Sequence, residues 1–341
     1  MIYNISPSAV TLTSGNDIYF FYDDDILYVE NCDKDVIDAV NKIKQGCTMD
    51  ELTKLLGKKE SLELLKSLKD INLLRINYKN DFSESIVEKQ VYFWESIFQS
   101  PNDIQKLIQT KRVCILGMGA VGSIIFQHLI GAGIKSFIII DNDKVELNNL
   151  NRQFIYNANH LKQLKVKCAQ EYATDIDKTI EVKKYPRFIN SVEDLSFLNK
   201  YKIDFFVCAA DLPPNKIQHI VNKFCIKNNI PFSFAALGIN YGTWGPLIIP
   251  QKTICYDCFC NEQEKHMTEM ELKVLKAANE VIKASFGPTN TTISALLSKD
   301  IIMFLSGNND IKTINSRKKF NFKTMEITTS FSVASGKCSC Y

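Results

Sequence analysis

The stretch "CILGMGAVGS" (residues 114–123) is followed by "IIIDND" (residues 138–143). An apolar strand, a Gly-x-Gly-x-x-Gly turn, a helix and a second strand ending in an acid predict a βαβ nucleotide-binding unit. Gly117 permits the tight turn, Gly119 lets phosphates approach the backbone, and Gly122 allows close packing of the helix. Asp141 ends the second strand, where its carboxylate can accept the ribose hydroxyls. The pattern predicts a nucleotide site without deciding which nucleotide.

Strand and helix patterns alternate around this stretch from Val113 to about Phe234. This alternation predicts an α/β fold with a doubly wound, mostly parallel sheet of the Rossmann type. Residues 261–283 are charged and helical, and we expect an excursion from the core there. The run "TTISALLSKDIIMFLSG" (residues 291–307) predicts an amphipathic helix that ends at Gly307.

The first 85 residues predict a separate, small α+β domain of winged-helix-like design. Residues 9–30 alternate as two strands with a polar turn, three short helices follow, and "LLRIN" (residues 73–77) closes the domain as a strand. Thr48 and Glu51 form a capping box at the start of the second helix. Residues 79–88 are polar, like a linker. We therefore expect domains at residues 1–85 and 86–341.

Charge is distributed unevenly between these two parts. Residues 1–85 hold 10 Lys+Arg against 15 Asp+Glu, whereas the remainder holds 31 against 23. The acidic N-terminal part is a poor nucleic-acid binder, and the basic remainder suits a phosphate-rich ligand. The chain shows neither an apolar run long enough to span a membrane nor a signal-peptide pattern. We expect a cytoplasmic protein without nucleic-acid or membrane partners, in which the 11 cysteines are reduced.

Basic residues after the ribose acid distinguish between nucleotide chemistries. Arg152 lies in "DNDKVELNNLNRQF" (residues 141–154), and Lys165 follows 13 residues later. Hydride transfer needs no such pair, whereas fixed cations stabilise the charge that develops when a phosphorus atom is attacked. Lys162 and Lys167 are alternatives to Lys165. The pattern favours phosphorus chemistry over an NAD-dependent oxidoreductase.

Asp211 follows the apolar strand in "IDFFVCAADLPPNK" (residues 203–216). The carboxyl ends of parallel strands line the ligand crevice of a doubly wound sheet. A carboxylate there can hold Mg²⁺ against a triphosphate, because Mg²⁺ prefers oxygen ligands. The alternative is an aspartate that only caps a strand–helix turn.

These motifs together resemble the ubiquitin-activating-enzyme-like (ThiF/MoeB-type) adenylyltransferase family over about residues 85–341. The resemblance implies that ATP is the nucleotide, that Asp141 binds its ribose and that Asp211 binds Mg²⁺. It also implies a set of side chains that address the phosphates, namely Asn149, Arg152, Gln153 and Lys165. The family reaction is attack of a carboxylate on the α-phosphate of ATP, which releases pyrophosphate. Residues 87–96 lack the arginine that the family often has before its first strand, and Lys89 is a possible replacement.

Within this family, "GINYGTWGPLIIPQKTICYDCF" (residues 238–259) and "FGPTNTTISALL" (residues 286–297) most resemble microcin C-type peptide adenylyltransferases. The acidic N-terminal part resembles modules that recognise leader peptides. The implied substrate is a short, ribosomally made precursor peptide activated at a carboxylate, and the implied assembly is a homodimer. Alternatives are activation of a ubiquitin-like sulfur-carrier protein and a peptide-presenting protein without catalysis.

Two cysteine pairs from distant segments of the C-terminal part predict a structural zinc site. Cys255 and Cys258 have the two-residue spacing of zinc ligands, and Cys338 and Cys340 could complete a Cys₄ set that clamps the C-terminus. The second pair is Cys-x-Cys, where the family has Cys-x-x-Cys. Cys260 is a further possible ligand, and metal-free packing is the alternative. Four thiolates would leave no open position for catalysis.

Overall fold

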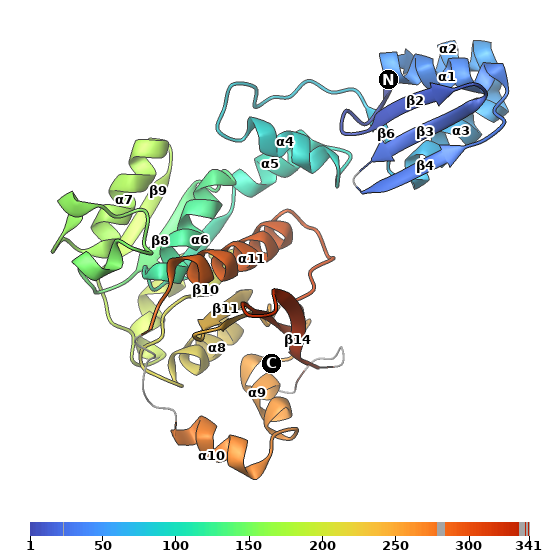
Figure 1. Ribbon diagram of the computed structural model, residues 1–341. Coiled ribbons are helices and arrows are strands. Elements are labelled where there is room, and N and C mark those ends of the chain that lie inside the picture. The colour runs from blue at the N-terminus through green and yellow to red at the C-terminus, as the bar shows by residue number, and fades with distance from the viewer. Residues whose placement is uncertain (23, 278–283, 334–337, 339, 341) are drawn as a thin grey trace. The chain divides into compact units, whose positions relative to one another are not determined.

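The computed structural model describes residues 1–22, 24–277, 284–333, 338 and 340 (Figure 1). Contacts divide the chain into two compact units, Met1–Gln105 and Lys106–Tyr341, here called the N-terminal and C-terminal units. Helix α4 (Glu88–Glu95) and the first half of α5 (Pro101–Gln109) group with the N-terminal unit. The division therefore falls later than the boundary at residue 85 that the polar segment had suggested.

The first 76 residues of the N-terminal unit pack two small antiparallel sheets against the helices α1 to α3, which precede α4. One sheet has the order β5 (Cys47–Thr48), β1 (Ile2–Ile5), β6 (Leu74–Ile76), and the other has the order β2 (Val10–Ser14), β3 (Asp17–Tyr22), β4 (Asp25–Val29). These helices span Lys34–Gln45 (α1), Met49–Leu56 (α2) and Lys58–Asp70 (α3). Their apolar faces and the inner side of the sheets share one core, which includes Ile18, Phe20, Ile43, Leu52 and Leu65.

Local signals in the N-terminal unit are confirmed where they are strongest. The Glu51 amide donates to Thr48 Oγ1 at 3.4 Å, and the Thr48 amide donates to Glu51 Oε2 at 2.8 Å, which is the expected capping box. The prediction of two strands in residues 9–30 is wrong, because the structure has three strands there, β2, β3 and β4. The run "IYFFYDDDILYVEN" folds back on itself, and the pair Tyr22↔Asp25 joins β3 to β4. Strand β1 also had no clear sequence signal.

The C-terminal unit is built on one eight-stranded sheet, which confirms the α/β, mostly parallel prediction. Its strand order is β14-β13-β12-β11-β10-β7-β8-β9. The parallel part comprises β7 (Arg112–Leu116), β8 (Ser136–Ile140), β9 (Glu181–Tyr185), β10 (Phe205–Cys208) and β11 (Phe232–Leu237). The antiparallel extension comprises β12 (Tyr241–Trp244), β13 (Ser316–Asn321) and β14 (Glu326–Ser332).

The C-terminal unit also contains six named helices, of which α6, α7 and α8 lie between consecutive parallel strands of the sheet. They are α6 (Ala120–Gly131), α7 (Lys165–Ile176), α8 (Ile217–Lys227), α9 (Tyr256–Glu264), α10 (Glu269–Ala277) and α11 (Gly287–Leu305). The charged segment 261–283 is helical in the end of α9 and in α10, and its residues 278–283 lie outside the described residues. Among the described helices, none is long and apolar enough to cross a membrane.

Helix α11 differs from the amphipathic helix that its sequence suggested. It begins at Gly287 and packs against α6, beside which it runs in Figure 1, and against β11 and β12. Most of its circumference is buried. Small and hydroxyl side chains, such as Thr289, Ser294 and Ser298, allow this close packing although they look polar in the sequence. Ser298 Oγ is satisfied inside the helix, since it donates to the Ser294 carbonyl at 2.7 Å.

Candidate nucleotide site

A cavity of about 770 Å³ lies at the carboxyl ends of the parallel strands of the C-terminal unit. All but one of the residues predicted to bind the nucleotide and its metal line this cavity. They are Gly117, Gly119, Asp141, Asn149, Arg152, Gln153, Lys165 and Asp211. Gly122 lies behind the lining, in α6. Motifs that are up to 94 positions apart in the chain, from Gly117 to Asp211, therefore share one cavity.

The three glycines have the three geometries that their spacing predicted. Gly117 has φ +91°, and a Cβ there would lie 2.8 Å from the backbone of Ala209 and Ala210. A Cβ at Gly122 would lie only 1.8 Å from the Gly117 carbonyl oxygen, so α6 packs directly on the turn. A Cβ at Gly119 would have no heavy atom within 4 Å, and this residue borders open space in the cavity. The turn thus exposes the backbone at the start of α6, where unpaired amides favour an anion.

The Asp141 carboxylate is held in place by the backbone around the cavity. It is 9% exposed, and it accepts from the Met118 amide at 2.6 Å and from the Asp143 amide at 2.7 Å. Burial raises the pKa of this carboxyl, while the nearby charge of Lys165 and the two amide bonds oppose that shift. The carboxylate is therefore fixed beside the glycine turn, with its remaining lone pairs available to hydroxyl donors.

Of the three candidate lysines, Lys165 is the one that lines the cavity. Its side chain is 7% exposed, and Nζ lies 2.9 Å from Asp143 Oδ2. Lys162 and Lys167, the two alternatives, are exposed and are not among the lining residues. A lysine at the start of α7 with its ammonium aimed at an acidic loop supplies a fixed positive charge beside the glycine turn.

The loop after β8 brings an arginine and two amides to the same cavity. The Arg152 guanidinium donates to the Asn148 carbonyl and to Asn151 Oδ1. Asn149 is buried and shapes the loop, because its Oδ1 accepts from the Glu146 amide at 3.0 Å. Gln153 is 3% exposed, and its Oε1 has no hydrogen-bond partner in the described part of the chain. Such a buried carbonyl oxygen in a cavity wall fits a ligand that carries a donor.

Asp211 lies three residues after the end of β10 and lines the cavity. It is exposed, and within the described residues its carboxylate makes no hydrogen bond or ion pair. It does not cap α8, whose N-cap position is Lys216 and shows no side-chain cap bond. The capping alternative therefore lacks support, and the free carboxylate oxygens fit a hard divalent cation such as Mg²⁺.

Other lining residues had no role in the sequence-based prediction. Arg187 and Phe188 follow β9, Ser285 comes just before α11, and Asn290 lies in its first turn. The Arg187 guanidinium sits 4.7 Å from the centroid of the Phe197 ring. The rule that strand carboxyl ends line the crevice could have found Arg187, whereas nothing in the sequence indicated that α11 starts beside the arginine loop.

Four cysteines from distant segments meet in the C-terminal unit. One sulfur from each of Cys255, Cys258, Cys338 and Cys340 lies within 4.8 Å of the others. Cys258 Sγ and Cys340 Sγ are 3.4 Å apart, and the Cys255 amide donates to Cys338 Sγ at 3.3 Å. Cys260 is not part of this group. A set of four sulfurs at this separation has the composition and size of a tetrahedral Zn²⁺ site.

A model of the ThiF family matches residues 88–341. The chain belongs to the ThiF family. Among curated proteins, the chain is 27% identical over 195 residues to the adenylyltransferase and sulfurtransferase UBA4 of Saccharomyces cerevisiae, a match that covers 54% of this chain and 42% of UBA4. It is 34% identical over 128 residues to the adenylyltransferase and sulfurtransferase MOCS3 of Arabidopsis thaliana, which covers 37% of this chain and 27% of that protein. This ThiF-family chain thus spans less than half the length of these two relatives.

Solved structures resemble the ThiF-family chain over both units. MccB of E. coli, solved with AMPCPP and MccA, has a TM-score of 0.82 at 23% identity, and the match covers 100% of this chain and 98% of MccB. PaaA has a TM-score of 0.71 at 18% identity, with 95% and 98% covered. At these identities the likeness concerns the fold, and it confirms the Rossmann-like architecture.

Proposed function

We propose that this protein is an ATP- and Mg²⁺-dependent adenylyltransferase that activates a carboxylate of a ribosomally synthesised peptide and releases pyrophosphate. The observation that carries the proposal is the convergence of the glycine turn, Asp141, Arg152, Lys165 and Asp211 on one cavity. Together these groups fit the ribose, the phosphates and the metal of MgATP. A hydride-transfer enzyme would not need the two cations or the Asp211 carboxylate.

The nucleotide would lie with its ribose against Asp141 and its phosphates along the glycine turn. The Asp141 carboxylate is already oriented by two backbone amides, so little reorganisation is needed to accept ribose hydroxyls. The backbone at Gly119 faces open space at the amino end of α6, which suits the phosphates. Asn149 keeps the following loop in shape, and Gln153 offers its buried oxygen to the bound nucleotide.

Adenylation needs the carboxylate oxygen of the substrate to form a bond with the α-phosphorus while the bond to the pyrophosphate breaks. Lys165 and Arg152 would stabilise the charge that develops on the phosphate oxygens and on the leaving group. Asp211 would hold Mg²⁺, which neutralises charge on the triphosphate. Orientation and charge neutralisation can carry the step without a nucleophilic side chain, because the substrate itself supplies the nucleophile.

A short precursor peptide is the substrate we favour, activated at its C-terminal carboxylate in the biosynthesis of a modified peptide natural product such as an antibiotic. Support comes from the α+β N-terminal unit, and from the likeness to MccB over 98% or more of both chains. One MccB structure is described as the microcin C7 biosynthetic enzyme in complex with N-formylated MccA. We propose that the N-terminal unit guides the peptide and that the protein acts as a homodimer.

The Cys₄ group would hold a structural Zn²⁺ that fastens the C-terminal segment to α9. Its four thiols supply the soft donors that zinc takes in closed sites. Two of these ligands, Cys338 and Cys340, lie more than 70 positions after Cys258, so a metal would cross-link distant parts of the unit. A saturated site of this kind contributes to stability and not to the reaction.

Activation of a ubiquitin-like sulfur-carrier protein is the second candidate. The names of the curated relatives UBA4 and MOCS3 favour it. The N-terminal unit, which has no role in that reaction that we can derive, counts against it. A peptide-presenting protein without catalysis is disfavoured by the intact set of cavity residues.

Pyrophosphate release from MgATP by the full chain tests the proposal. We expect release with a peptide substrate, and an approximately 100-fold lower rate for Lys165→Met. Lys167→Met, an exposed neighbour on the same helix, is the matched control and should retain the rate. Release with a Gly-Gly-tailed carrier protein and not with peptides would favour the second candidate. Binding of NAD in preference to ATP would reject both.

A further inference from the structure

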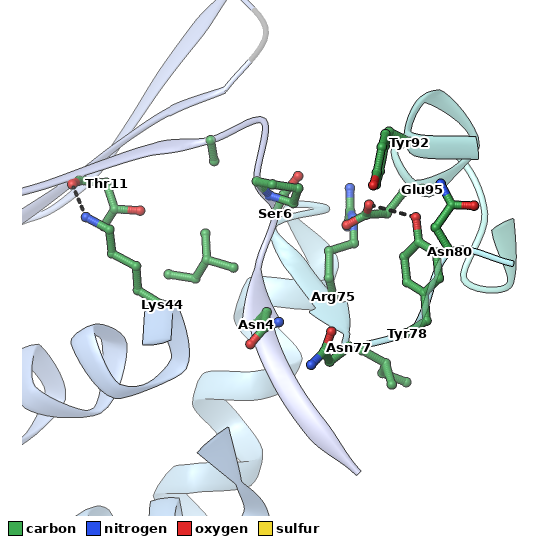
Figure 2. A pocket seen from close by; sticks show the side chains of 14 residues that line it. Asn4, Ser6, Thr11, Lys44, Arg75, Asn77, Tyr78, Asn80, Tyr92 and Glu95 are labelled. Atoms are coloured by element: carbon green, nitrogen blue, oxygen red, sulfur yellow. Dashed lines mark hydrogen bonds and ion pairs between the residues drawn. The ribbon is translucent and has the colours of Figure 1, made fainter. Parts of the chain in front are cut away.

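A second cavity, of about 470 Å³, lies within the N-terminal unit. Its walls come from β1, β2, α1, β6, α4 and the segments beside them (Figure 2). The polar side chains that line it include Thr11, Lys44, Arg75, Tyr78 and Glu95. None of these residues belongs to the nucleotide site described above. The cavity therefore calls for its own explanation.

Two buried polar groups in this cavity have no hydrogen-bond partner in the described part of the chain. Thr11 is 9% exposed, and its Oγ1 is unpartnered. Arg75 is 8% exposed, and its Nε is unpartnered although its terminal nitrogens donate to Asn72 Oδ1, the Leu74 carbonyl and Tyr22 Oη. A buried O–H and a buried N–H without acceptors are unfavourable in a folded protein, and a ligand with oxygen acceptors would satisfy both.

The charges that line the cavity are not balanced. Lys44 and Arg75 are cationic, and Glu95 is the anionic group among the described lining residues. Glu95 is engaged at one end: Tyr78 Oη donates to its Oε2 at 3.2 Å, and its Oε1 lies 3.9 Å from Arg75 Nε. Figure 2 shows Lys44 and Thr11 together at the other end, where Lys44 Nζ donates to the Thr11 carbonyl at 3.2 Å. No carboxylate among the lining residues neutralises Lys44.

We propose that this cavity binds a carboxylate-bearing ligand. The carboxylate lies beside the Lys44 ammonium and accepts from the Thr11 hydroxyl, and a second oxygen acceptor of the ligand accepts from Arg75 Nε. Because Arg75 has only part of its donor fork unused, a carbonyl or carboxylate oxygen suits it better than a phosphate, which takes several donors. An acidic residue in an extended peptide carries both acceptors, as does a free dicarboxylic acid.

The source of the carboxylate connects the site to the proposed function. If the substrate is a peptide, as proposed above, the ligand is an acidic residue of that peptide held by the N-terminal unit. This connection rests on the proposed function, whereas carboxylate binding itself does not. Binding measured without ATP therefore tests the site, and pyrophosphate release tests the function, so that either can fail alone.

Three probes separate the possibilities in heteronuclear NMR titrations of the full chain. They are acetyl-Ala-Glu-Ala-amide, its matched neutral analogue acetyl-Ala-Gln-Ala-amide, and glutarate. We expect saturable shifts of the Thr11 amide and the Arg75 side chain with the Glu peptide, and binding roughly tenfold weaker with the Gln peptide. Tighter binding of the Glu peptide than of glutarate identifies a peptide ligand, and the reverse identifies a free acid. Equal binding of the two peptides, or absence of binding by both the Glu peptide and glutarate, overturns the proposal.

Variants that should change the affinity for the Glu peptide in opposite directions make the test specific. Lys44→Gln, at an exposed position that tolerates change, should weaken binding of the Glu peptide roughly tenfold, and Thr11→Val should weaken it also. Glu95→Gln removes the one opposing charge and should tighten binding. Lys42→Gln, on the same helix but outside the cavity lining, is the control and should leave binding unchanged. Tighter binding in Lys44→Gln or weaker binding in Glu95→Gln would show a site for a cation and overturn the proposal.

Discussion

Substitution of Gly122 by alanine tests whether the packing of α6 on the glycine turn creates the nucleotide site. The added Cβ would lie 1.8 Å from the Gly117 carbonyl oxygen, whereas ordinary contacts begin at 3.4 Å. The helix and the turn must therefore separate by about 1.6 Å, the difference between those two distances. The opposing atoms are backbone, so no side-chain rotation can relieve the contact.

This displacement has a stability component and a functional component. Overpacking of this kind costs about 1–3 kcal/mol. A shift of roughly 1 Å at a phosphate-binding turn lowers the rate about 100-fold, because the reacting groups are no longer aligned. Gly131→Ala, in the last turn of the same helix, is the matched control, since a Cβ there meets nothing within 4 Å. It should stabilise the protein by about 0.5 kcal/mol and leave ATP binding intact.

Calorimetric titration with ATP and thermal unfolding of both variants provide the measurement. We expect Gly122→Ala to lose measurable ATP binding and to unfold at a lower temperature than the native protein, while Gly131→Ala unfolds slightly higher. Native ATP affinity in Gly122→Ala would refute the account of the turn. Loss of ATP binding in Gly131→Ala would show that the helix responds to substitution in general.

Three further predictions concern charge and metal. Lys165→Ala should lower ATP-dependent activity about 100-fold, and Lys167→Ala should not, as steady-state rates will show. Burial raises the pKa of Asp141 above its unfolded value, so the contribution of this carboxyl to stability decreases as the pH rises between those two pKa values. ATP affinity should fall at low pH, because protonation removes the carboxylate that accepts the ribose hydroxyls. Calorimetric ATP titrations at several pH values should find that this loss of affinity at low pH is absent in Asp141→Asn. Metal analysis should find one zinc per chain, lost with lowered thermal stability in Cys338→Ser and retained in Cys260→Ser.

The sequence predicted the parts of the fold whose signals are local. The glycine turn, the acid at the end of β8 and the capping box of Thr48 and Glu51 depend on residues close in the chain, and the structure contains all three. Ligands of doubly wound sheets bind at the carboxyl ends of the strands, and this general rule was enough to predict that Asp211 lines the nucleotide cavity, as it does together with Lys165.

Features that depend on tertiary packing were not predictable in the same way. The sequence of α11 predicts an amphipathic helix, but its packing between α6 and the sheet buries most of its circumference. The start of α11 lies beside the arginine loop, where a Cβ added to Gly287 would be 3.0 Å from the Asn151 carbonyl oxygen, and these two segments are far apart in the chain. The sequence pattern predicted one strand where the structure has two, because β3 and β4 pair as a hairpin in which Tyr22 is opposite Asp25.

The central claim is that the protein joins the α-phosphate of ATP to a peptide carboxylate. The most direct measurement is product analysis by mass spectrometry and phosphate-specific assays, with the full chain, MgATP and synthetic candidate precursor peptides that have a free C-terminal carboxylate. The account predicts pyrophosphate in step with ATP loss and an adenylyl group on the peptide or AMP in solution, and no product from the same peptide with an amidated C-terminus. Formation of ADP and orthophosphate, or equal turnover of the amidated peptide, would contradict it.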